Sequence, residues 1–300
     1  MKFLVFGHKG WIGGQVIAHI QSLGHEAIGA DSRAENEKDV EDNITRVNPD
    51  RVISLIGRTR GGEFLTIDYL EQKGKLVENM RDNLWGPMVL AALCKKHNVH
   101  FTYLGTGCVF HYDNDMFQLG NGNGFKESDI PNFFGSSYST VKGYTDRMMH
   151  LLFNESALNC RIRMPITPDN SPYNFITKIA GYSKVINVPN SMTVLPELIP
   201  VFIDLSINKT TGTINLTNPG AISHNEVLAL YQQYVDPSFK WENFTIEEQD
   251  KILLGARSNN LLDSQRLQEL YPNVDDIHTA VAKVCQKMKE AHPDGIVKKK

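Results

Sequence analysis

Short apolar runs alternate with amphipathic stretches along the first half of the chain. Five runs have the length of buried strands, and they lie at residues 2–6, 25–30, 51–56, 99–104 and 158–164. The stretches between them carry apolar side chains at three- and four-residue steps, as Val16, Ile17, Ile20 and Leu23 do, which is typical of helices packed on one face. This alternation over residues 1–165 predicts a doubly wound, parallel α/β sheet.

Helices are expected between the strands and again in the second half. In the first half, one helix follows the first strand and ends at Gly24. Others cover residues 36–47, 68–97 and 136–153, and the second of these has a break near Gly86-Pro87. After Pro165, further prolines separate shorter elements, with helices predicted at 195–207, 224–234, 263–271 and 276–291 and a strand at 213–216. We therefore expect a nucleotide-binding domain over 1–165 and a smaller substrate-binding domain over 166–300. Part of 196–220 is expected to return to the main sheet.

Composition narrows the class of protein. The chain has 300 residues, 41% hydrophobic and 22% charged, which is typical of a soluble globular protein. A net charge of −3 gives no broad basic face, so we expect no nucleic-acid partner. No run reaches the ~18 apolar residues of a membrane span. The four cysteines match no metal spacing, and no signal peptide precedes the first strand, so a reduced, cytoplasmic setting is expected.

A glycine-rich turn follows the first apolar run. Gly7, Gly10 and Gly13 are spaced GxxGxxG between a predicted strand and a predicted helix. This arrangement lets the backbone approach a diphosphate and aims the N–H groups of a helix N-terminus at it, as in a Rossmann-type dinucleotide site. An ordinary strand–helix turn is the alternative. Cofactor contacts are expected from the whole turn: Gly7, His8, Lys9, Gly10, Trp11, Ile12 and Gly13.

The ends of the next two strands supply further candidate cofactor contacts. Asp31 lies about 20 residues after the glycine turn, where an acidic residue usually holds the ribose hydroxyls. Ser32 and Arg33 instead suit a 2′-phosphate, so we expect NADPH as cofactor, with NADH tolerated. A plain turn with solvated charges is the alternative. Ile56 and Gly57 end the third strand at the same edge of the sheet. Arg58 and Arg60 follow, either as diphosphate contacts or as solvated loop arginines.

Tyr138 and Lys142 form a candidate acid–base pair. They are four residues apart, so one helix face presents both. A nearby ammonium group is expected to lower the pKa of a tyrosine, which is ~10 in water. Thr106 ends the fourth strand and can donate to a carbonyl oxygen. Together the three residues suit the reduction of a ketone by hydride, although a packed tyrosine beside a solvated lysine is the other interpretation.

These motifs resemble those of the extended short-chain dehydrogenase/reductases over nearly the whole chain. The resemblance is carried by the glycine turn, Asn83-x-x-Gly86, Thr106 and Tyr138-x-x-x-Lys142. The chain is more specifically similar to the nucleotide-rhamnose synthase/epimerase-reductases, which also form the C-terminal half of plant rhamnose synthases. Segments similar to that family include 106–110, 124–127, 163–166, 174–178, 189–192, 217–220, 223–226 and 257–260.

The resemblance implies a bifunctional enzyme with a nucleotide-sugar substrate. It would epimerise UDP-4-keto-6-deoxyglucose at C3 and C5 and then reduce the C4 ketone to give UDP-β-L-rhamnose. Cys108 and Lys178 match the family residues that serve epimerisation, although a small buried cysteine and a solvated lysine are the plain alternatives. The remaining implied contacts are Asn83 and Pro165 for the cofactor and Asn174, Asn190, Arg257 and Asn259 for the substrate. Pairing of family members through helices such as 136–153 implies a homodimer.

Two departures from the family pattern and two rival functions remain. The loop after the third strand reads Ser54-Leu55-Ile56-Gly57 where the family has a segment closer to NAAG, and the loop at 111–120 is one residue longer. A reductase alone, as in dTDP-rhamnose synthesis, is one alternative, and the sequence does not decide between UDP and dTDP. The other is a non-catalytic module like the regulatory subunit of methionine adenosyltransferase, against which the intact Thr106, Tyr138 and Lys142 argue.

Overall fold

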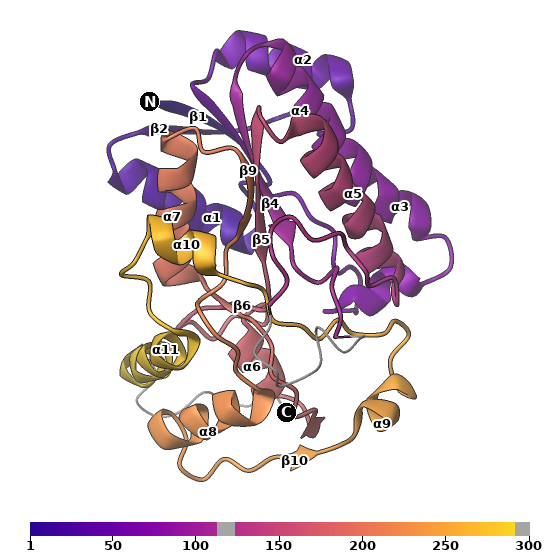
Figure 1. Ribbon diagram of the computed structural model, residues 1–300, viewed down its shortest axis with the longest axis vertical. Helices are drawn as coiled ribbons and strands as arrows, with labels where there is room; N and C mark the ends of the chain where they lie inside the picture. Colours follow the sequence, from indigo (N-terminus) through magenta and orange to yellow (C-terminus); the bar gives the residue numbers. More distant parts are fainter. Residues whose placement is uncertain (113–123, 292–300) are drawn as a thin grey trace.

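A six-stranded parallel sheet forms the centre of the computed structural model, which describes residues 1–112 and 124–291 (Figure 1). The strand order is β2-β1-β3-β4-β5-β9, and each neighbouring pair is parallel. The strands are β1 (Lys2–Phe6), β2 (Glu26–Gly29), β3 (Arg51–Ser54), β4 (His100–Thr106), β5 (Ala157–Ile162) and β9 (Gly212–Asn215). The predicted α/β fold is confirmed.

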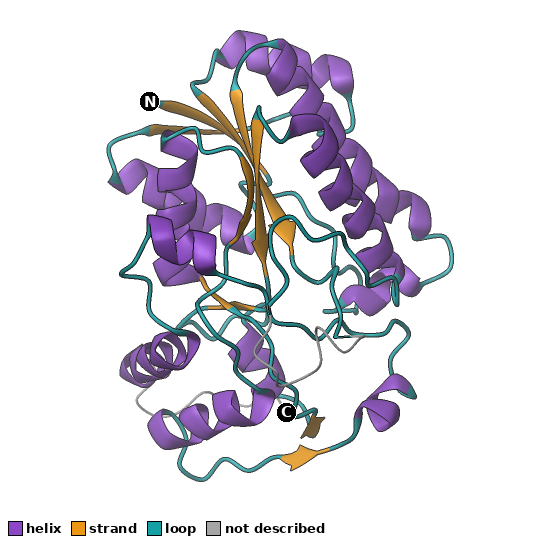
Figure 2. Cartoon of the chain, in the orientation of Figure 1, coloured by secondary structure: helices purple, strands orange, loops and turns teal. Residues whose placement is uncertain are grey.

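Helices cover both faces of this sheet (Figure 2). On one face, α1 (Trp11–Ser22), α7 (Leu195–Ile207) and α10 (Gln265–Leu270) pack against the sheet in one hydrophobic core. On the other, α2 (Glu37–Val47), α4 (Gly86–Lys96) and α5 (Ser137–Phe153) form a second core. The strands other than the edge strand β2 are largely buried on both sides, which explains why they read as apolar runs rather than an alternating pattern.

The predicted helix over 68–97 is a succession of four elements. A 3₁₀ helix, η1 (Ile67–Glu71), is followed after a short gap by α3 (Leu76–Met80), a π-helical turn η2 (Arg81–Trp85) and α4. Pro87 lies in the first turn of α4, which continues directly from η2, so its missing N–H interrupts the hydrogen-bond pattern of a continuous helix. The expected break near Gly86-Pro87 is therefore a π turn, and π turns are frequent at functional sites.

The second half of the chain builds a separate hydrophobic core below the sheet. It contains α6 (Phe175–Ala180), α8 (His224–Tyr234) and α11 (Ile277–Ala291). Two short parallel strand pairs flank it, β6 (Pro165–Ile166) with β8 (Thr193–Val194) and β7 (Lys184–Val185) with β10 (Glu242–Asn243). The other element is α9 (Ile246–Asp250). Within the segment 196–220, β9 pairs with β5 of the main sheet. The division at residue 165 stays a prediction.

Two features of the loops bear on the site. Most of the loop at 111–120, for which the sequence indicates an insertion, lies outside the described residues. After it, Phe125 pairs with Leu262, and the two pack with Val109 and Phe110 in a small core of their own. In the described part of the chain, no helix combines the length and apolar character needed to cross a membrane.

Candidate active site

The glycine turn between β1 and α1 is sterically required. Gly7 has φ +82°, and a Cβ there would lie 2.9 Å from the carbonyl carbon of Leu55. A Cβ on Gly13 would lie 2.2 Å from the Gly7 oxygen, so only glycine lets the helix pack this close to the turn. The sequence therefore specifies both the turn and the close approach of α1 to β1.

The N-terminus of α1 is suited to an anion. Gly10 is the N-cap and offers no side-chain cap, and the first turn of the helix carries no acidic residue. Trp11, Ile12 and Gly13 border the main cavity, so the positive end of the helix dipole faces it. These features fit the diphosphate of a dinucleotide. His8 and Lys9 do not border this cavity; the His8 ring packs instead against Gly29, where a Cβ would lie 2.4 Å from it.

One cavity of about 750 Å³ runs from the glycine turn to the second half of the chain. It brings together residues that are far apart in the sequence and that the motifs had singled out. Those bordering it are Gly7, Gly10, Trp11, Ile12, Gly13, Ile56, Gly57, Thr106, Cys108, Tyr138, Lys142, Pro165, Lys178, Arg257 and Asn259. Arg58 and Arg60 border it as well. The site thus lies at the carboxyl edge of the sheet, as doubly wound folds predict.

Thr106, Tyr138 and Lys142 meet where β4 and α5 face the cavity. Ser136 caps α5 by accepting a hydrogen bond from the backbone N–H of Ser139 at 3.1 Å, which fixes the start of the helix. Tyr138 is 8% exposed and Lys142 is 4% exposed. Thr106 and Tyr138 border the same cavity, and the proximity of Thr106 acts to lower the pKa of Tyr138. The structure therefore gathers the three residues for which the sequence predicts ketone chemistry.

The charge state of this group differs from the expectation. Burial raises the pKa of Tyr138 well above its ordinary value, with the nearby Cys108 adding to the rise. The Lys142 ammonium donates its hydrogen bond to the hydroxyl of Tyr103 on β4, and burial lowers the pKa of Lys142 to about 8. The pKa of Tyr138 is therefore not lowered as expected. The reason is that the Lys142 ammonium is hydrogen-bonded to the neutral hydroxyl of Tyr103.

Cys108 is the accessible thiol of the protein. Cys94, Cys160 and Cys285 are fully buried, whereas Cys108 is half-buried and borders the cavity. Its backbone N–H donates to the Thr106 hydroxyl at 3.1 Å, so the end of β4 fixes both residues together. The side chain packs beside Tyr138, which places a nucleophilic sulfur next to the candidate proton donor.

Lys178 approaches the same cavity from α6. Burial, and then repulsion from Arg60, lower the pKa of Lys178 to about 8. The guanidinium of Arg60 lies 3.3 Å from the centre of the Tyr173 ring, which holds this second cation in place. Tyr173 in turn lies against Trp11 of the glycine turn, with 6.2 Å between ring centres. Lys178 is therefore a half-buried amine with a pKa of about 8, a property suited to proton transfer.

Arg257 borders the cavity and is held in position by Asp68. Asp68 accepts hydrogen bonds from both terminal nitrogens of Arg257 and from the backbone N–H groups of Leu254 and Gly255, at 3.1 and 3.2 Å. Although burial acts to raise it, the pKa of Asp68 is lowered overall by these donors. Asp68 thus fixes the orientation of the guanidinium and also neutralises part of its positive charge.

Two of the expected substrate residues do not reach the cavity. Asn174 is fully buried and caps α6: its Oδ1 accepts from the N–H of Ile176 at 3.3 Å, and its Nδ2 donates to Thr167 O at 2.9 Å. Asn190 is also fully buried, and its Nδ2 donates to Asn259 Oδ1 at 2.9 Å. Their amides are used inside the protein, so we correct both from substrate contacts to supports of the residues that line the site.

Asn83 likewise supports the site from behind. Its Oδ1 accepts from the N–H of Arg58 at 2.9 Å, and its Nδ2 donates to the Arg58 carbonyl at 2.8 Å. This pair of bonds ties the π turn to the loop after β3. Asn83 is fully buried and is not among the residues that border the cavity. We therefore correct it from a direct cofactor contact to a residue that positions the loop.

The residues expected at the ribose of the cofactor are engaged elsewhere. Asp31 accepts from Asn43 at 2.6 Å and Arg46 at 2.9 Å and so turns toward α2, away from the cavity. Ser32 lies beside it, with a buried hydroxyl that has no partner among the described residues. Neither residue borders the main cavity, and the ribose contact of Asp31 stays a prediction.

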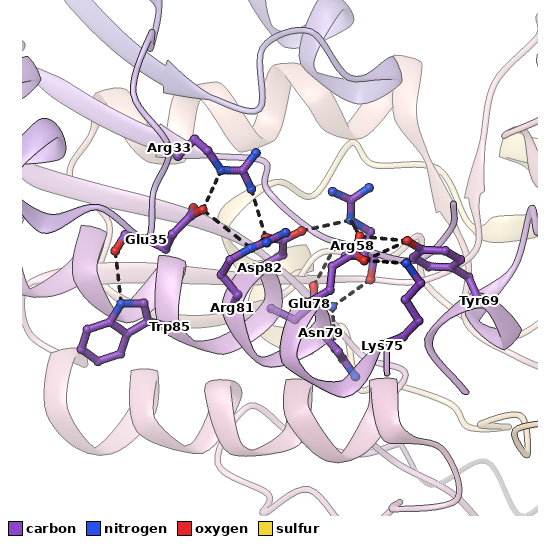
Figure 3. Close-up of polar contacts among 11 residues, drawn as sticks. Arg33, Glu35, Arg58, Tyr69, Lys75, Glu78, Asn79, Arg81, Asp82 and Trp85 are labelled. Carbon is purple, nitrogen blue, oxygen red and sulfur yellow. Dashed lines mark hydrogen bonds and ion pairs between the residues drawn. The ribbon is translucent and has the colours of Figure 1, made fainter. Parts of the chain in front are cut away.

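Arg33 is part of an ionic network over the π turn (Figure 3). It pairs with Glu35 at 2.6 Å and with Asp82 at 3.5 Å. Arg58 and Arg81 bind the same Asp82, at 3.0 and 2.8 Å. Asp82 thus gathers arginines from the loops after β2 and β3. In the ligand-free chain Arg33 is not available to a 2′-phosphate without leaving these carboxylates.

Four residues that border or support the site were not expected from the sequence. Tyr103 and Arg163 lie in or next to apolar strands, where a polar residue usually signals only internal hydrogen bonding. Tyr173 follows a loop of prolines and small polar residues. His224 begins α8 and borders the cavity, and burial lowers its pKa to about 4. A strongly polar residue inside an otherwise buried strand is the one signal that could have found Tyr103 and Arg163.

The chain matches known proteins across nearly its whole length. A model of the NAD dependent epimerase/dehydratase family matches residues 3–181. Protein L780 of Acanthamoeba polyphaga mimivirus is 55% identical over 289 residues, which are 96% of this chain and 99% of that protein. A crystal structure of the L780 UDP-rhamnose synthase from this virus covers 96% of the chain, and 99% of its own, with a TM-score of 0.93.

Two proteins of Arabidopsis thaliana are also similar. A bifunctional dTDP-4-dehydrorhamnose 3,5-epimerase/dTDP-4-dehydrorhamnose reductase is 40% identical over 283 residues, which are 94% of this chain and 91% of that protein. A trifunctional UDP-glucose 4,6-dehydratase/UDP-4-keto-6-deoxy-D-glucose 3,5-epimerase/UDP-4-keto-L-rhamnose-reductase is 41% identical over 286 residues. That match covers 94% of this chain but 41% of the longer plant protein.

Proposed function

The chain belongs to the NAD dependent epimerase/dehydratase family, and on that basis we propose that it is a bifunctional 3,5-epimerase and 4-reductase. Its proposed substrate is UDP-4-keto-6-deoxy-D-glucose, its product UDP-β-L-rhamnose and its cofactor NADPH, with NADH accepted. The similarity to a UDP-rhamnose synthase and to two plant enzymes of rhamnose synthesis supports this substrate class.

One observation carries the proposal: a single cavity joins two kinds of chemistry. Thr106, Tyr138 and Lys142 supply the groups that a ketone reductase needs, and the glycine turn supplies a place for the cofactor. Cys108 and Lys178 border the same space from β4 and α6. A reductase acting alone has no use for a thiol and a second buried amine beside its ketone site, so the pair favours epimerisation and reduction in one place.

The fit of a dinucleotide follows from the glycine turn. The uncapped N-terminus of α1 would hold the diphosphate, and Ile56, Gly57 and Pro165 would line its path toward the ketone site. When bound, the cofactor supplies a hydride to C4 of the sugar. Arg33 would have to exchange Glu35 and Asp82 for a 2′-phosphate, which is the step on which the proposed preference for NADPH depends.

Side chains of the protein then supply the proton that the reduction needs. Tyr138 would donate its hydroxyl proton to the C4 oxygen, while Thr106 hydrogen-bonds to the same oxygen. The raised pKa of Tyr138 keeps this proton in place until the oxygen becomes basic. The positive charge of Lys142 would stabilise the phenolate that remains. This description requires Lys142 to be protonated, which its pKa of about 8 allows at neutral pH.

Epimerisation would use the acidity that the C4 ketone gives to the hydrogens on C3 and C5. Each inversion needs a base on one face of the sugar and an acid on the other. Cys108 and Lys178 come from different parts of the fold and border the cavity together, so we assign them these roles.

Product analysis tests the proposed function directly. The purified protein is incubated with UDP-4-keto-6-deoxy-D-glucose and NADPH, and the product is identified by NMR. We expect UDP-β-L-rhamnose, with the configurations at C3 and C5 inverted and a new hydroxyl-bearing stereocentre formed at C4 by the reduction. A product reduced at C4 without inversion at C3 and C5 would support the reductase alone and reject the bifunctional assignment. The same incubation with the dTDP sugar measures the nucleotide preference.

Arg257 is proposed to bind the diphosphate of the nucleotide sugar. Arg257→Lys keeps the charge but loses the two-pronged geometry, so we expect KM for the sugar to rise roughly tenfold, as a lost charged hydrogen bond of about 1.5 kcal/mol predicts. Steady-state kinetics measure this effect, and fluorescence titration with NADPH is expected to be unchanged. A weaker affinity for NADPH with normal KM for the sugar would place Arg257 at the cofactor instead.

A homodimer is proposed to form through α3 and α5, which lie side by side (Figure 1). Both helices expose large apolar side chains, with Val77 75% and Leu151 61% exposed. Large apolar side chains gathered on exposed helices often mark an interface. We expect Val77→Glu and Leu151→Glu together to give a monomer in sedimentation velocity, while Leu270→Glu, at a 50% exposed site on α10, leaves the dimer intact. A monomeric wild-type protein would reject the proposal.

We propose a cytoplasmic location.

A further inference from the structure

Two arginines of the loop after β3 border the cavity but have opposite surroundings. Arg58 pairs with Asp82 at 3.0 Å and with Glu78 at 3.2 Å, so carboxylates of the network over the π turn neutralise its charge (Figure 3). Over residues 1–112 and 124–291, the guanidinium of Arg60 forms no hydrogen bond and no ion pair. The structure therefore distinguishes two arginines between which the sequence does not.

Arg60 is held by the face of its guanidinium. The central carbon of this group lies 3.3 Å from the centre of the Tyr173 ring. At this separation the guanidinium lies flat on the ring, because an edge-on approach would push its nitrogens into the aromatic carbons. Stacking occupies the face of the cation and leaves its N–H groups, which lie in its plane, available to acceptors. Arg60 is thus a preorganised donor without an acceptor.

A second cation at the same wall of the cavity also lacks a counter-ion. The ammonium of Lys178 forms no hydrogen bond and no ion pair within the described part of the chain, and repulsion from Arg60 adds to the effect of burial on its pKa. Burial lowers the pKa of Arg60 as well. Two partly buried like charges destabilise a protein unless an opposite charge joins them, so this wall is suited to an anionic ligand.

The aromatic stack places Arg60 at the glycine-turn end of the cavity. The ring of Tyr173 lies against Trp11, with 6.2 Å between ring centres, and Trp11 is the first residue of α1. The N-terminus of α1 has no side-chain cap, and Trp11 borders the cavity. Arg60 and the positive end of the α1 dipole therefore serve the same end of the cavity, and together they match a diphosphate.

The opposite end of α6 faces a different cation. Tyr173 precedes this helix, whereas Tyr182 follows it, and both border the cavity. The charges of Arg257 and Asp68 act on the pKa of Tyr182, so Arg257 lies near that end. The cavity thus has a cationic group at each end of α6. Arg257 is the residue proposed above for the nucleotide sugar, which leaves Arg60 for the dinucleotide.

We propose that Arg60 binds the diphosphate of the dinucleotide cofactor together with the N-terminus of α1, and that Tyr173 is the positioning residue that holds Arg60 there. This inference rests on the cofactor of the proposed function and not on the sugar chemistry. Tyr173 belongs to the second half of the chain, so the cofactor site draws on both halves. The N–H groups of Arg60 donate to diphosphate oxygens, and no covalent bond changes.

Titration with three ligands tests the assignment of Arg60. Arg60→Met keeps most of the stem and deletes the charge, and circular dichroism verifies its fold. We expect Kd for NADPH and for NADH, measured by cofactor fluorescence, to rise roughly tenfold alike, because both cofactors contain the diphosphate. Kd for UDP, measured by calorimetry, should stay unchanged. Lys73→Met is the matched control, since Lys73 is exposed and does not border the cavity, and it should bind all three ligands normally.

Other patterns in Arg60→Met contradict the proposal, each in its own way. A loss confined to NADPH would place Arg60 at the 2′-phosphate, because NADH lacks that group. A loss confined to UDP would place it at the nucleotide sugar. Unchanged affinity for all three ligands would leave Arg60 as a residue that only packs on Tyr173.

Two variants of Tyr173 test its positioning role. Tyr173→Phe keeps the ring under Arg60 and should bind NADPH like the wild type. Tyr173→Leu removes the stack, and we expect Kd for NADPH and NADH to rise roughly threefold, as the loss of one cation–π contact predicts. In the double variant with Arg60→Met, Tyr173→Leu should add no further loss, whereas additive losses would reject its action through Arg60. If Arg60→Met does not fold, a folded Tyr173→Leu with wild-type affinity for both cofactors rejects the proposal.

The titrations need no turnover of the sugar, so this inference and the proposed function can fail separately. If Arg60→Met weakens both cofactors but the wild type does not convert UDP-4-keto-6-deoxy-D-glucose, the cofactor site stands and the proposed reaction fails. If the wild type forms UDP-β-L-rhamnose and Arg60→Met binds both cofactors normally, the proposed reaction stands and the role of Arg60 is rejected.

Discussion

Tyr138→Phe is expected to lower the rate of C4 ketone reduction by about 10²–10⁴-fold, which is the usual cost of removing a general acid. Phenylalanine keeps the ring that packs against Tyr69 and Leu70, so the fold and the shape of the cavity are retained. It cannot supply the proton that the C4 oxygen needs as hydride arrives. The rate is measured as NADPH oxidation with the 4-keto sugar already inverted at C3 and C5, so that only reduction is observed.

Tyr234→Phe is the matched control for this variant. Tyr234 lies on α8 and packs against the core of the second half of the chain, away from the residues that border the cavity. Loss of its hydroxyl is expected to leave NADPH oxidation unchanged. Near-normal reduction by Tyr138→Phe would remove Tyr138 from the role of acid.

Lys142→Ala is expected to lose reduction to a similar degree, for a reason that also predicts a pH dependence. Because burial lowers the pKa of Lys142 to about 8, the ammonium that stabilises the phenolate is lost as the pH rises through that value. Reduction by the wild type should therefore fall above about pH 8. A rate that stays flat to pH 10 would contradict this account of Lys142.

The main sheet and its helices follow from local sequence patterns. Strands buried on both faces read as continuous apolar runs, and Leu195–Ile207 and His224–Tyr234 were predicted with the bounds that the structure gives. The short strand pairs around β6 and β7 have two residues per strand, too few for any periodicity to appear. α6 has six residues and follows a proline-rich loop, so its helical pattern is equally weak.

The sequence predicted which residues line the site, but not which side chains they are hydrogen-bonded to. Residue type and spacing identified Thr106, Tyr138 and Lys142, and the family resemblance implied Cys108 and Lys178; all five border one cavity. Sequence does not reveal which polar side chains are already hydrogen-bonded inside the protein. For that reason Asn174 and Asn190 were assigned to the substrate. The same limit applies to charge: the partner of Lys142 is Tyr103, a strand residue that no motif connects with it.

Cys108→Ser and Lys178→Met are expected to lose epimerisation while keeping reduction, which is the second large effect. Serine keeps nearly the size of cysteine but is a far weaker base at neutral pH, where a thiol has a reference pKa of ~8.5. Methionine keeps the apolar stem of Lys178 and deletes the proton carrier. We expect exchange of the hydrogens at C3 and C5 with D₂O, measured by NMR before NADPH is added, to fall by about 10²–10⁴-fold in each variant.

The two variants are separated by the pH dependence of exchange. Because burial and Arg60 lower the pKa of Lys178 to about 8, wild-type exchange should slow as the pH rises above that value and Lys178 loses its proton. In Lys178→Met this upper limb should disappear from the residual rate. Lys184→Met is the matched control, since Lys184 is exposed and lies outside the residues that border the cavity.

Retained reduction is the decisive control, because it distinguishes a lost proton carrier from a damaged cavity. Neither residue touches the glycine turn, so both variants should bind NADPH as the wild type does. Given substrate already inverted at C3 and C5, both should oxidise NADPH through Thr106, Tyr138 and Lys142. If Cys108→Ser exchanges both hydrogens at the wild-type rate, Cys108 is a packing residue beside Tyr138, and the base must come from another side chain that borders the cavity.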